Sequence, residues 1–430
     1  MASFREFVEK VEKEGKLVKV KRELSKELEL AGIMKYFEGS PVLAENIKGS
    51  SFRAVGNLFA TRELVAEFLG VPKEKLVHKL AEAVNGPSKP EVVEEAAFME
   101  KREENVTRMP IPLHLERDGG PYICSGIVMA RDPELGQNCS YHRMMQLDGN
   151  SFSVRILPRH LHKFIEKAGG ELDVAVVVGA PINVMLASAV SSKLGENELE
   201  IANSLAPLKV HTLSNGIEVP AEAEFVLEGK ITNEMADEGP FLDLTETFDI
   251  VRKQNVLRVK HVWHRKDALF HVLLPGGMEH KLLMGMPREP TILNEVNKVA
   301  ECTGVNVTPG GCSWLHAVVG IRKKGEEDGK KAVEAAFAGH RSLKRVIVVD
   351  EDIDIHDPED VEWALATRFQ AKNGLSVREE PGSSLDPSAD PESRVTSKVG
   401  MDATKPLAEE GRFGKGKFME IKDPQEYVEV

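Results

Sequence analysis

The sequence predicts an α/β protein (α+β multidomain) built from three domains. Its 430 residues exceed what one compact core usually holds, since domains average about 150 residues. Helical and strand patterns mix over residues 1–115, strand patterns dominate residues 116–305, and strands alternate with helices over residues 306–430. We therefore expect an N-terminal α/β domain, a β-rich central domain that is most simply a barrel, and a C-terminal α/β domain with a tail.

The N-terminal domain shows two amphipathic patterns. Apolar residues recur every three or four positions at 4–11 and again at 30–37, which predicts two helices with one buried face each. The runs "PVLAENI" and "FRAVGNLFA" are typical of short strands, and residues 61–84 are typical of further helices. Pro and Gly in "MPIPLHLERDGGPY" then mark the end of this region.

The central domain contains apolar or alternating runs that predict strands. These are "VAVVVGA", "EAEFVLEGKIT", "NVLRVKHVW" and "ALFHVLLPGG". The polar turn from His264 to Asp267 predicts that the last two runs form a hairpin. The stretch around "LDGNS" predicts two further strands joined by a turn.

The C-terminal domain alternates between the two patterns. "HAVVGIR" and "KRVIVVDEDID" read as strands, and "GKKAVEAAFAG" and "DPEDVEWALATRF" read as helices, so we expect a parallel sheet. The following stretch, centred on residues 379–397, is rich in Pro, Ser, Gly and charge and has no aromatic residue, which predicts a loop or mobile segment.

Composition excludes several classes of function. A net charge of -13 disfavours nucleic-acid binding, although an acidic protein can still carry a local positive pocket for an anion. No apolar run of about 18 residues predicts a membrane span, and the charged amphipathic N-terminus does not resemble a secretion signal, so we expect a cytoplasmic protein. The four cysteines form no C-x-x-C pair and are expected to be reduced thiols.

Familiar catalytic motifs are absent, so individual polar residues have to be weighed. In "GQNCSYHRMMQ", Arg143 offers a fixed charged fork for a carboxylate, and Asn138 with an imidazole and a distant carboxylate could hold a hard cation. The alternative is that these residues form the polar faces of ordinary strands. The glutamates of "GENELEIANSLA" are equally consistent with the solvated first turn of a helix, and Lys398 with a surface lysine.

The stretch "ADEGPFLDLTET" places Glu238 and Asp243 on either side of a Gly-Pro turn. A polar loop is one interpretation. The other is a pair of carboxylates with different duties, because burial raises the pKa of a carboxyl group and a nearby arginine lowers it. One acid could then hold an ion pair while the other carries a proton.

Taken in chain order, the motifs resemble the UbiD-like decarboxylases, enzymes that use prenylated FMN. The resemblance rests on "NCSYHRMMQ", "LPRHL", "GAPINVMLASA", "ENELEIANSL", "VPAEAEFVLEG", "EGPFLD", "DIDIHDPEDVEWALATR" and "SKVGMDAT", and it covers nearly the whole chain. It implies that the central domain is a flavin-reductase-like split β-barrel that binds the cofactor. It also implies that the C-terminal domain builds a homodimer or higher homo-oligomer.

The resemblance implies a metal-assisted cofactor site. Asn138, His160 and Glu198 would bind Mn²⁺ (or Mg²⁺), which also meets the cofactor phosphate, and K⁺ would lie nearby on backbone carbonyls around Cys139 and residues 187–190. Lys398 would approach the same phosphate. The full set of implied cofactor-binding residues is Ser140, Tyr141, His142, Arg143, Arg159, His160, Ser188, Glu198 and Lys398.

The resemblance also implies a catalytic triad of Arg143, Glu238 and Asp243. Arg143 would orient the substrate carboxylate, Glu238 would hold the arginine, and Asp243 would donate the proton after CO₂ leaves. Many members have glutamate at the second acidic position, so the shorter Asp243 changes the donor's reach. Leu242 stands where a small glycine is common and narrows the pocket.

Substrate and partners follow only from the branch of the family that the chain resembles. A compact, Lys- and Glu-rich chain is most similar to the archaeal branch, which converts trans-anhydromevalonate 5-phosphate to isopentenyl phosphate and CO₂ in a modified mevalonate pathway. The alternative substrate is 4-hydroxy-3-polyprenylbenzoate or a related aromatic acid of quinone biosynthesis. A flavin prenyltransferase would supply the cofactor.

Two further classes stay open at this point. One is a barrel that binds ordinary FMN for a redox reaction, and the other is a binding protein without catalysis. A substrate phosphate would need basic groups at the pocket mouth, for which Arg155 and Lys193 are candidates.

Overall fold

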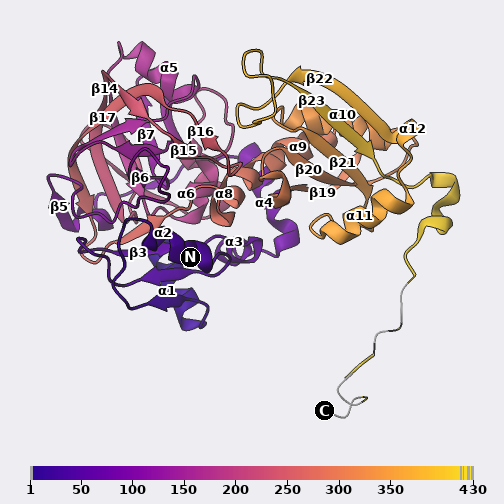
Figure 1. Cartoon of the computed structure of the whole chain (residues 1–430), viewed down its shortest axis with the longest axis horizontal. Helices are drawn as coiled ribbons and strands as arrows, with labels where there is room; N and C mark the ends of the chain where they lie inside the picture. The colour runs from indigo at the N-terminus through magenta and orange to yellow at the C-terminus, as the bar shows by residue number, and fades with distance from the viewer. Residues whose placement is uncertain (1–2, 417–418, 420, 424–426, 428–430) are drawn as a thin grey trace.

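The computed structural model describes residues 3–416, 419, 421–423 and 427. Within these residues the strands form five sheets, of which the largest has nine strands and the next has five. Figure 1 shows the nine-stranded sheet in one lobe, the five-stranded sheet in a second lobe, and the N-terminal segment packed beneath the first. The α/β class predicted from the sequence is confirmed.

The N-terminal segment forms a small sheet covered by helices. Helix α1 begins after Ser3, whose hydroxyl accepts the Glu6 N–H, and it buries Phe4 and Phe7. Strands β2 and β3 form where the pattern predicted short strands, and they pair antiparallel. The elements are α1 (Phe4–Lys13), β1 (Val18–Val20), α2 (Glu29–Tyr36), β2 (Val42–Ala44), β3 (Arg53–Gly56), α3 (Arg62–Leu69) and α4 (Leu76–Asn85).

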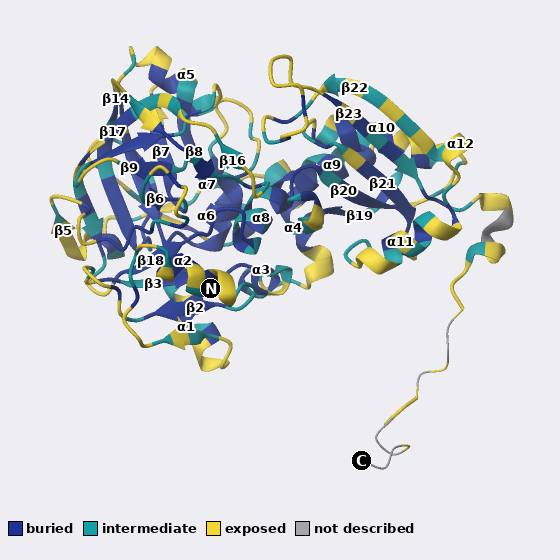
Figure 2. Cartoon of the chain, viewed as in Figure 1, coloured by how far each residue is buried: buried dark blue, intermediate teal, exposed yellow. Residues whose placement is uncertain are grey.

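The nine-stranded sheet carries the centre of the molecule. Along β11 the side chains alternate between two hydrophobic clusters, with Ala175 and Val177 on one face and Val174 and Val176 on the other. Both faces are therefore buried, as Figure 2 shows. The strands are β5 (Lys101–Glu103), β6 (Tyr122–Ile123), β7 (Ile127–Asp132), β8 (Gly136–Tyr141), β9 (Met144–Gln146), β10 (Ser151–Val154), β11 (Leu172–Val178), β14 (Phe225–Glu238) and β17 (Arg252–His264).

This sheet is an open one. Its strand order is β6-β9-β10-β17-β14-β11-β7-β8, with β5 added beside β17, so β6 and β8 are opposite ends of the path. Hydrogen bonding between the described strands does not close it into a barrel. The prediction of a β-rich central region is confirmed. The strand pairing does not show the split barrel that the family resemblance implied.

The predicted hairpin between residues 255–263 and 268–277 is wrong. Strand β17 stays in the large sheet, whereas β18 (Leu269–Val272) pairs parallel with β3 in the N-terminal sheet. The backbone carbonyl of Glu224 binds the Arg265 N–H and its carboxylate binds the Leu269 N–H, which redirects the chain. All four residues of β18 are buried, so its burial comes from a sheet formed by distant sequence.

The C-terminal lobe is built on the five-stranded sheet. Strands β20, β21 and β23 run parallel as predicted, whereas the edge strands β19 and β22 pair antiparallel, so the sheet is mixed. The sheet begins at Glu301, inside the stretch predicted to be central. The elements are α9 (Glu289–Val296), β19 (Glu301–Val307), β20 (His316–Arg322), α10 (Asp328–Gly339), β21 (Arg345–Asp350), α11 (Pro358–Thr367), α12 (Ala371–Gly374), β22 (Leu375–Pro381) and β23 (Val395–Asp402).

The stretch predicted as a loop is a loop in its middle, whereas its two ends belong to strands β22 and β23. Strands β22 and β23 pair antiparallel through seven register partners from Leu375 to Pro381. Between them, residues 382–394 form a loop anchored by Asp386, which accepts hydrogen bonds from Thr396 (2.8 Å) and Ser388 (2.8 Å). Despite partial burial, these bonds and Lys344 lower the pKa of Asp386 to about 2.

Further helices and short strands cover the large sheet and join the two lobes. They are β4 (Glu91–Val92), α5 (His160–Lys167), α6 (Ile182–Ala187), α7 (Glu198–Leu205), β12 (Lys209–Thr212), β13 (Glu218–Pro220), β15 (Phe241–Leu242), β16 (Phe248–Asp249), α8 (Met278–Gly285) and the 3₁₀ turn η3 (Met286–Arg288). Among the described residues, no helix has the length and apolarity that crossing a bilayer requires.

Candidate active site

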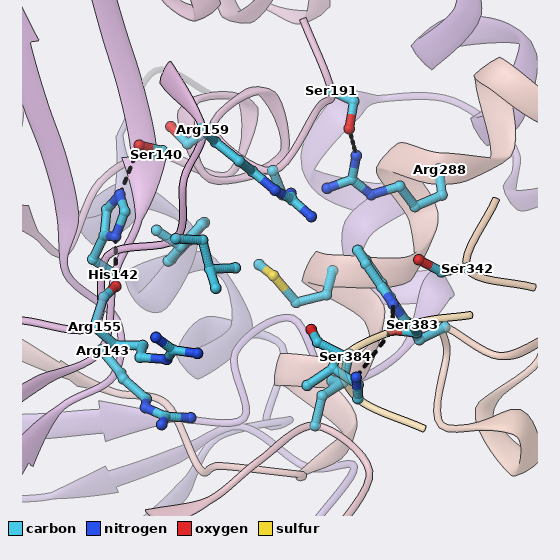
Figure 3. Close-up of a pocket in the computed structure, with 18 of the residues that line it drawn as sticks. Ser140, His142, Arg143, Arg155, Arg159, Ser191, Arg288, Ser342, Ser383 and Ser384 are labelled. Carbon is cyan, nitrogen blue, oxygen red and sulfur yellow. Dashed lines mark hydrogen bonds between the residues drawn. The ribbon is translucent and has the colours of Figure 1, made fainter. Parts of the chain in front are cut away.

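A cavity of about 960 Å³ lies where the large sheet meets the C-terminal lobe. Residues 138–143, 155–163, 188–192, 280–288, 338–342 and 382–385 contribute to its wall, so both lobes are required to form it. Figure 3 shows side chains from these segments pointing into a common space. Besides Arg143, its wall includes six more arginines: Arg155, Arg159, Arg252, Arg288, Arg341 and Arg394.

Arg143, between β8 and β9, is surrounded by carboxylates. Its Nε and Nη2 donate to the two oxygens of Glu238 at 2.9 and 3.0 Å, and its Nη1 donates to Asp243 at 2.6 Å. Nη2 also donates to Asp249 at 2.8 Å. Four of the five N–H groups of the guanidinium are thus engaged, which leaves one on Nη1.

The pairing fixes both the charge and the orientation of Arg143. Burial alone would lower its pKa, but the bonds to Glu238 and the nearby Asp243 raise the pKa above its ordinary value. The guanidinium carbon also lies 4.5 Å from the centre of the Phe241 ring. The arginine therefore stays charged and presents one edge to the cavity.

Glu238, at the end of β14, is fully buried and is held by Tyr122. The Tyr122 hydroxyl donates to Glu238 at 3.0 Å and accepts the Gly239 N–H at 3.1 Å. Burial and the Glu238 charge raise the pKa of Tyr122, so it remains a phenol donor. The sequence analysis missed Tyr122, because a single tyrosine 116 positions from its partner leaves no local pattern.

The Gly239–Pro240 peptide bond is cis and turns the chain from β14 into β15. Strand β15 pairs with β16, with Phe241 opposite Asp249, and this short ribbon carries both Asp243 and Asp249. The predicted bend between Glu238 and Asp243 thus places the two acids on adjoining sides of Arg143. The side chains of Asp243 and Asp249 are each 20% exposed, whereas the Glu238 side chain is completely buried.

Asp249 is a fourth member of the group that the sequence analysis missed. In addition to Arg143, it pairs with Arg252 at 2.5 Å and lies 3.9 Å from Arg155. Burial opposes ionisation, but the bonds from Arg252 and Arg143 lower the pKa of Asp249. Its i, i+3 spacing from Arg252 was the one local signal in the sequence.

Two of the three predicted metal ligands, Asn138 and Glu198, are in contact on another side of the cavity. The Asn138 amide donates to Glu198 at 3.2 Å, the Cys139 N–H donates to the other oxygen at 2.8 Å, and Ser192 donates as well. His160, at the start of α5, lines the same cavity. Glu198 is 2% exposed, so the interpretation of a solvated helix start is wrong for this residue.

These residues fit a hard divalent cation. Burial raises the pKa of Glu198 to about 7, although the hydrogen bonds from Ser192, Cys139 and Asn138 act in the opposite direction. Burial and nearby cations lower the pKa of His160, which favours the neutral imidazole that a metal requires. Of the described residues, no three His, Cys, Asp or Glu side chains cluster as a metal site, so a cation here would depend on the Asn138 oxygen.

Most other predicted cofactor contacts also line the cavity. They are Ser140, Tyr141, His142, Arg159 and Ser188. The His142 ring bonds the Arg155 carbonyl at 2.9 Å and the Ser140 hydroxyl at 3.0 Å, and burial lowers its pKa to about 4. His142 is therefore neutral and fixed in orientation.

Lys398 lies elsewhere. It is 2% exposed, donates to the Arg341 carbonyl at 2.7 Å and lies 3.4 Å from Glu380. Arg341 lines the cavity, whereas Lys398 is not part of the described lining. The geometry therefore places Lys398 behind Arg341, outside the wall of the cavity.

Comparison with known proteins assigns the family. Profiles of the N-terminal, Rift-related and C-terminal domains of 3-octaprenyl-4-hydroxybenzoate carboxy-lyase (UbiD) match residues 8–84, 85–278 and 281–403. The anhydromevalonate phosphate decarboxylase of Methanocaldococcus jannaschii is 44% identical over 89% of this chain and 92% of its own length. The enzyme of that name from Methanosarcina mazei is 42% identical over 96% and 98%.

A solved structure agrees with these matches. An evolved dimeric form of the UbiD-class enzyme HmfF from Pelotomaculum thermopropionicum, in complex with prFMN, superposes with a TM-score of 0.89 at 35% identity, covering 100% of this chain and 99% of that one. The three matched domains occur here in order, and the second and third of them supply nearly all the residues that line the cavity with Arg143. The chain belongs to the UbiD family of carboxy-lyases.

Proposed function

We propose that this protein decarboxylates trans-anhydromevalonate 5-phosphate to isopentenyl phosphate and CO₂. The observation that carries the proposal is the charge layout of the cavity, where an arginine enclosed by carboxylates and a separate wall of arginines suit an acid that also bears a phosphate. The relatives named anhydromevalonate phosphate decarboxylase, at 42% and 44% identity, support the same substrate.

The proposal includes prenylated FMN as the cofactor. The large sheet would bind it and would correspond to the split barrel implied by the family resemblance. Asn138, His160 and Glu198 would hold Mn²⁺ or Mg²⁺, and backbone carbonyls near Cys139 and residues 187–190 would hold K⁺. When bound, the flavin supplies the electron sink for loss of CO₂. The prFMN of the HmfF complex supports this choice of cofactor.

Arg143 would orient the substrate carboxylate. Only one Nη1 N–H is free, and three carboxylates already surround the guanidinium. A substrate carboxylate therefore has to displace one of them to form a two-point contact. Asp249 is the best candidate, because Arg252 remains to neutralise it once it leaves Arg143.

Asp243 would return a proton to the carbon that loses CO₂. It lines the cavity, and its side chain is partly exposed, so it can both reach the substrate and exchange protons. Glu238 is fully buried behind Arg143 and would act only as the anchor of the arginine. The different burial of the two acids supports the different roles.

Two partners follow from the proposal. A flavin prenyltransferase would supply the cofactor, and a homo-oligomer is supported by the dimeric HmfF relative. Among the described strands, β22 forms one edge of the C-terminal sheet, and its Val377 is 63% exposed. This edge strand is a candidate contact between copies of the chain.

Product analysis tests the proposed function. Protein produced with a prenylated-flavin supply should form isopentenyl phosphate from trans-anhydromevalonate 5-phosphate, and cofactor-free protein should not. A 4-hydroxybenzoate carrying a prenyl chain is the competing substrate. Turnover of that aromatic acid alone, by fully loaded protein, would contradict the proposed substrate while leaving the family assignment unchanged.

A further inference from the structure

The carboxylate of Asp243 is bound at both of its oxygens. Arg143 Nη1 donates to Oδ2 at 2.6 Å, and the Leu244 N–H donates to Oδ1 at 2.6 Å. A carboxylate held at one oxygen can still rotate about its Cβ–Cγ bond, whereas one held at both oxygens has a single orientation. The Leu244 N–H therefore helps to orient the acid that is the candidate proton donor.

The side chain of Leu244 is buried in an apolar cluster. It is 2% exposed and packs with Trp314 and Leu315, and Met284 and Leu385 lie against the same cluster. Trp314, Leu315 and Leu385 belong to the C-terminal lobe, whereas Leu244 follows β15, which continues from the large sheet. Leu244 thus connects the ribbon that carries Asp243 to the other lobe.

Trp314, the largest member of this cluster, is itself held in place. Its Nε1 donates to the Ser383 hydroxyl at 3.0 Å, the Arg288 guanidinium lies 5.0 Å from the centre of its ring, and the His340 ring lies edge-on at 4.8 Å. Figure 3 shows Ser383 on the opposite side of the cavity from Arg143. The surface on which Leu244 packs is therefore fixed by contacts on that side of the cavity.

The ribbon that carries Asp243 depends on contacts outside itself. Strands β15 and β16 pair through only two residues each, which is too short to be stable alone. Two backbone hydrogen bonds close the turn, from the Glu246 N–H to the Asp243 carbonyl at 2.9 Å and from the Asp243 N–H to the Thr247 carbonyl at 3.0 Å. Because the turn is closed, a shift of Leu244 also shifts Asp243.

We propose that Leu244 is a positioning residue for Asp243. The packing of its side chain on Trp314 and Leu315 holds its N–H against the carboxylate, and this contact sets the direction in which the acid faces the reacting carbon. The inference rests on the proposed function, because it assumes that Asp243 returns the proton. In this role Leu244 acts through Asp243 and not through the substrate.

Direct contact with the substrate is the rival role for Leu244, since this residue also lines the cavity. The two roles affect different kinetic constants. Misplacing the proton donor slows turnover and leaves substrate binding intact, so it lowers kcat. Loss of an apolar contact with the bound substrate raises KM instead.

The test compares Leu244→Ala with Leu293→Ala in cofactor-loaded protein. Leu293 is 5% exposed in the core of the C-terminal lobe and does not line the cavity, so it controls for the same loss of buried apolar atoms. In Leu244→Ala, kcat should fall about 10²-fold with KM changed less than about threefold, because a small misplacement of an acid is costly. In Leu293→Ala, kcat should change less than about threefold.

Leu244→Met tests whether packing is the cause. Methionine fills nearly the same volume, so kcat should stay within about threefold of the wild-type value. Unchanged kcat in Leu244→Ala, a loss confined to KM, or an equal fall in Leu293→Ala would overturn the proposal. Leu385→Ala, at a less buried partner of Leu244, repeats the test should Leu244→Ala fail to fold.

A crystal structure of Leu244→Ala decides the matter without turnover. The Asp243 carboxylate should leave its position on Arg143 Nη1, and an unchanged position would contradict the positioning role. If wild-type protein decarboxylates an aromatic acid instead of trans-anhydromevalonate 5-phosphate, the proposed substrate fails. The same comparison of variants with that aromatic acid, together with the crystal structure, still tests Leu244.

Discussion

Arg143 and Arg288 line one cavity and both stack on an aromatic ring, yet their electrostatic surroundings are opposite. Arg143 is bound by Glu238, Asp243 and Asp249, and its pKa is raised. Arg288 has a serine and no described carboxylate, and burial lowers its pKa to about 9. The protein itself supplies the countercharge of the first arginine, whereas none of the described carboxylates pairs with the second.

The difference separates two kinds of binding residue. An arginine fixed by its own carboxylates is preorganised, so it can position a reacting group without first being ordered. An arginine without them gains most of its pairing energy from the ligand and therefore contributes to affinity. We expect the Arg143 side of the cavity to determine kcat.

Removing each arginine should have opposite effects on stability. Arg143→Met leaves Glu238 buried without its cation, so the free energy of unfolding should fall by about 3–5 kcal/mol, and decarboxylation should be lost. Arg288→Met removes an unpaired buried charge and should leave stability unchanged or increased. Urea unfolding of cofactor-free protein measures both. Equal destabilisation by the two changes would show that Arg288 has a countercharge of its own.

Asp243→Asn tests whether Asp243, beside Arg143, donates the proton in the reaction. The amide keeps the size of the side chain but cannot donate a proton as an acid, so kcat should fall by about 10²–10⁴-fold with little change in KM. Asp243→Glu is the matched control, because it retains the acid and lengthens its reach. Steady-state kinetics that gave an unchanged kcat for Asp243→Asn would exclude this residue as the donor.

The pH dependence of stability tests whether His340, which lies near Arg288, is buried as a neutral imidazole. Burial, assisted by Arg288, lowers the pKa of His340 to about 3, below its ordinary value of about 6.5. The folded state therefore excludes a proton that the unfolded chain takes up, so stability is present above pH 6.5 and is lost on acidification. Between pH 7 and 5 the loss from this residue is about 2 kcal/mol.

His340→Gln should remove that part of the pH dependence, since the amide can still bond the Trp314 carbonyl and does not titrate. Denaturant unfolding at pH 7 and at pH 5 compares the two proteins. The same loss of stability on acidification in His340→Gln and wild type would mean that His340 is protonated in the folded protein.

The smallest expected effect concerns Asp249. If it competes with the substrate carboxylate for Arg143, Asp249→Asn should lower KM about threefold, the size expected for a partly exposed ion pair of under about 1 kcal/mol. The value of kcat should change little. A raised KM would instead assign Asp249 to holding Arg143 in place, as Glu238 does.

Local sequence patterns predicted the elements better than their pairing. The helices at 4–13 and 29–36 and the parallel strands β20 and β21 follow from periodicity, which depends on neighbours a few residues apart. The hairpin between β17 and β18 was wrong because both runs suit a buried strand in any sheet. The predicted loop at 379–397 was partly strand, since pairing with distant residues outweighed its polar composition.

The sequence by itself determined the family, because a series of motifs, including those that contain Arg143, Glu238 and Asp243, occurs in the family's order along nearly the whole chain. Only the tertiary structure brought in Tyr122, Asp249 and Arg288. Arg143 is 106 positions from Asp249, and Arg288 is 97 positions from Ser191. Contacts over such separations, and the burial that leaves Arg288 without a described carboxylate, arise when distant segments pack together, and they leave no local pattern in the sequence.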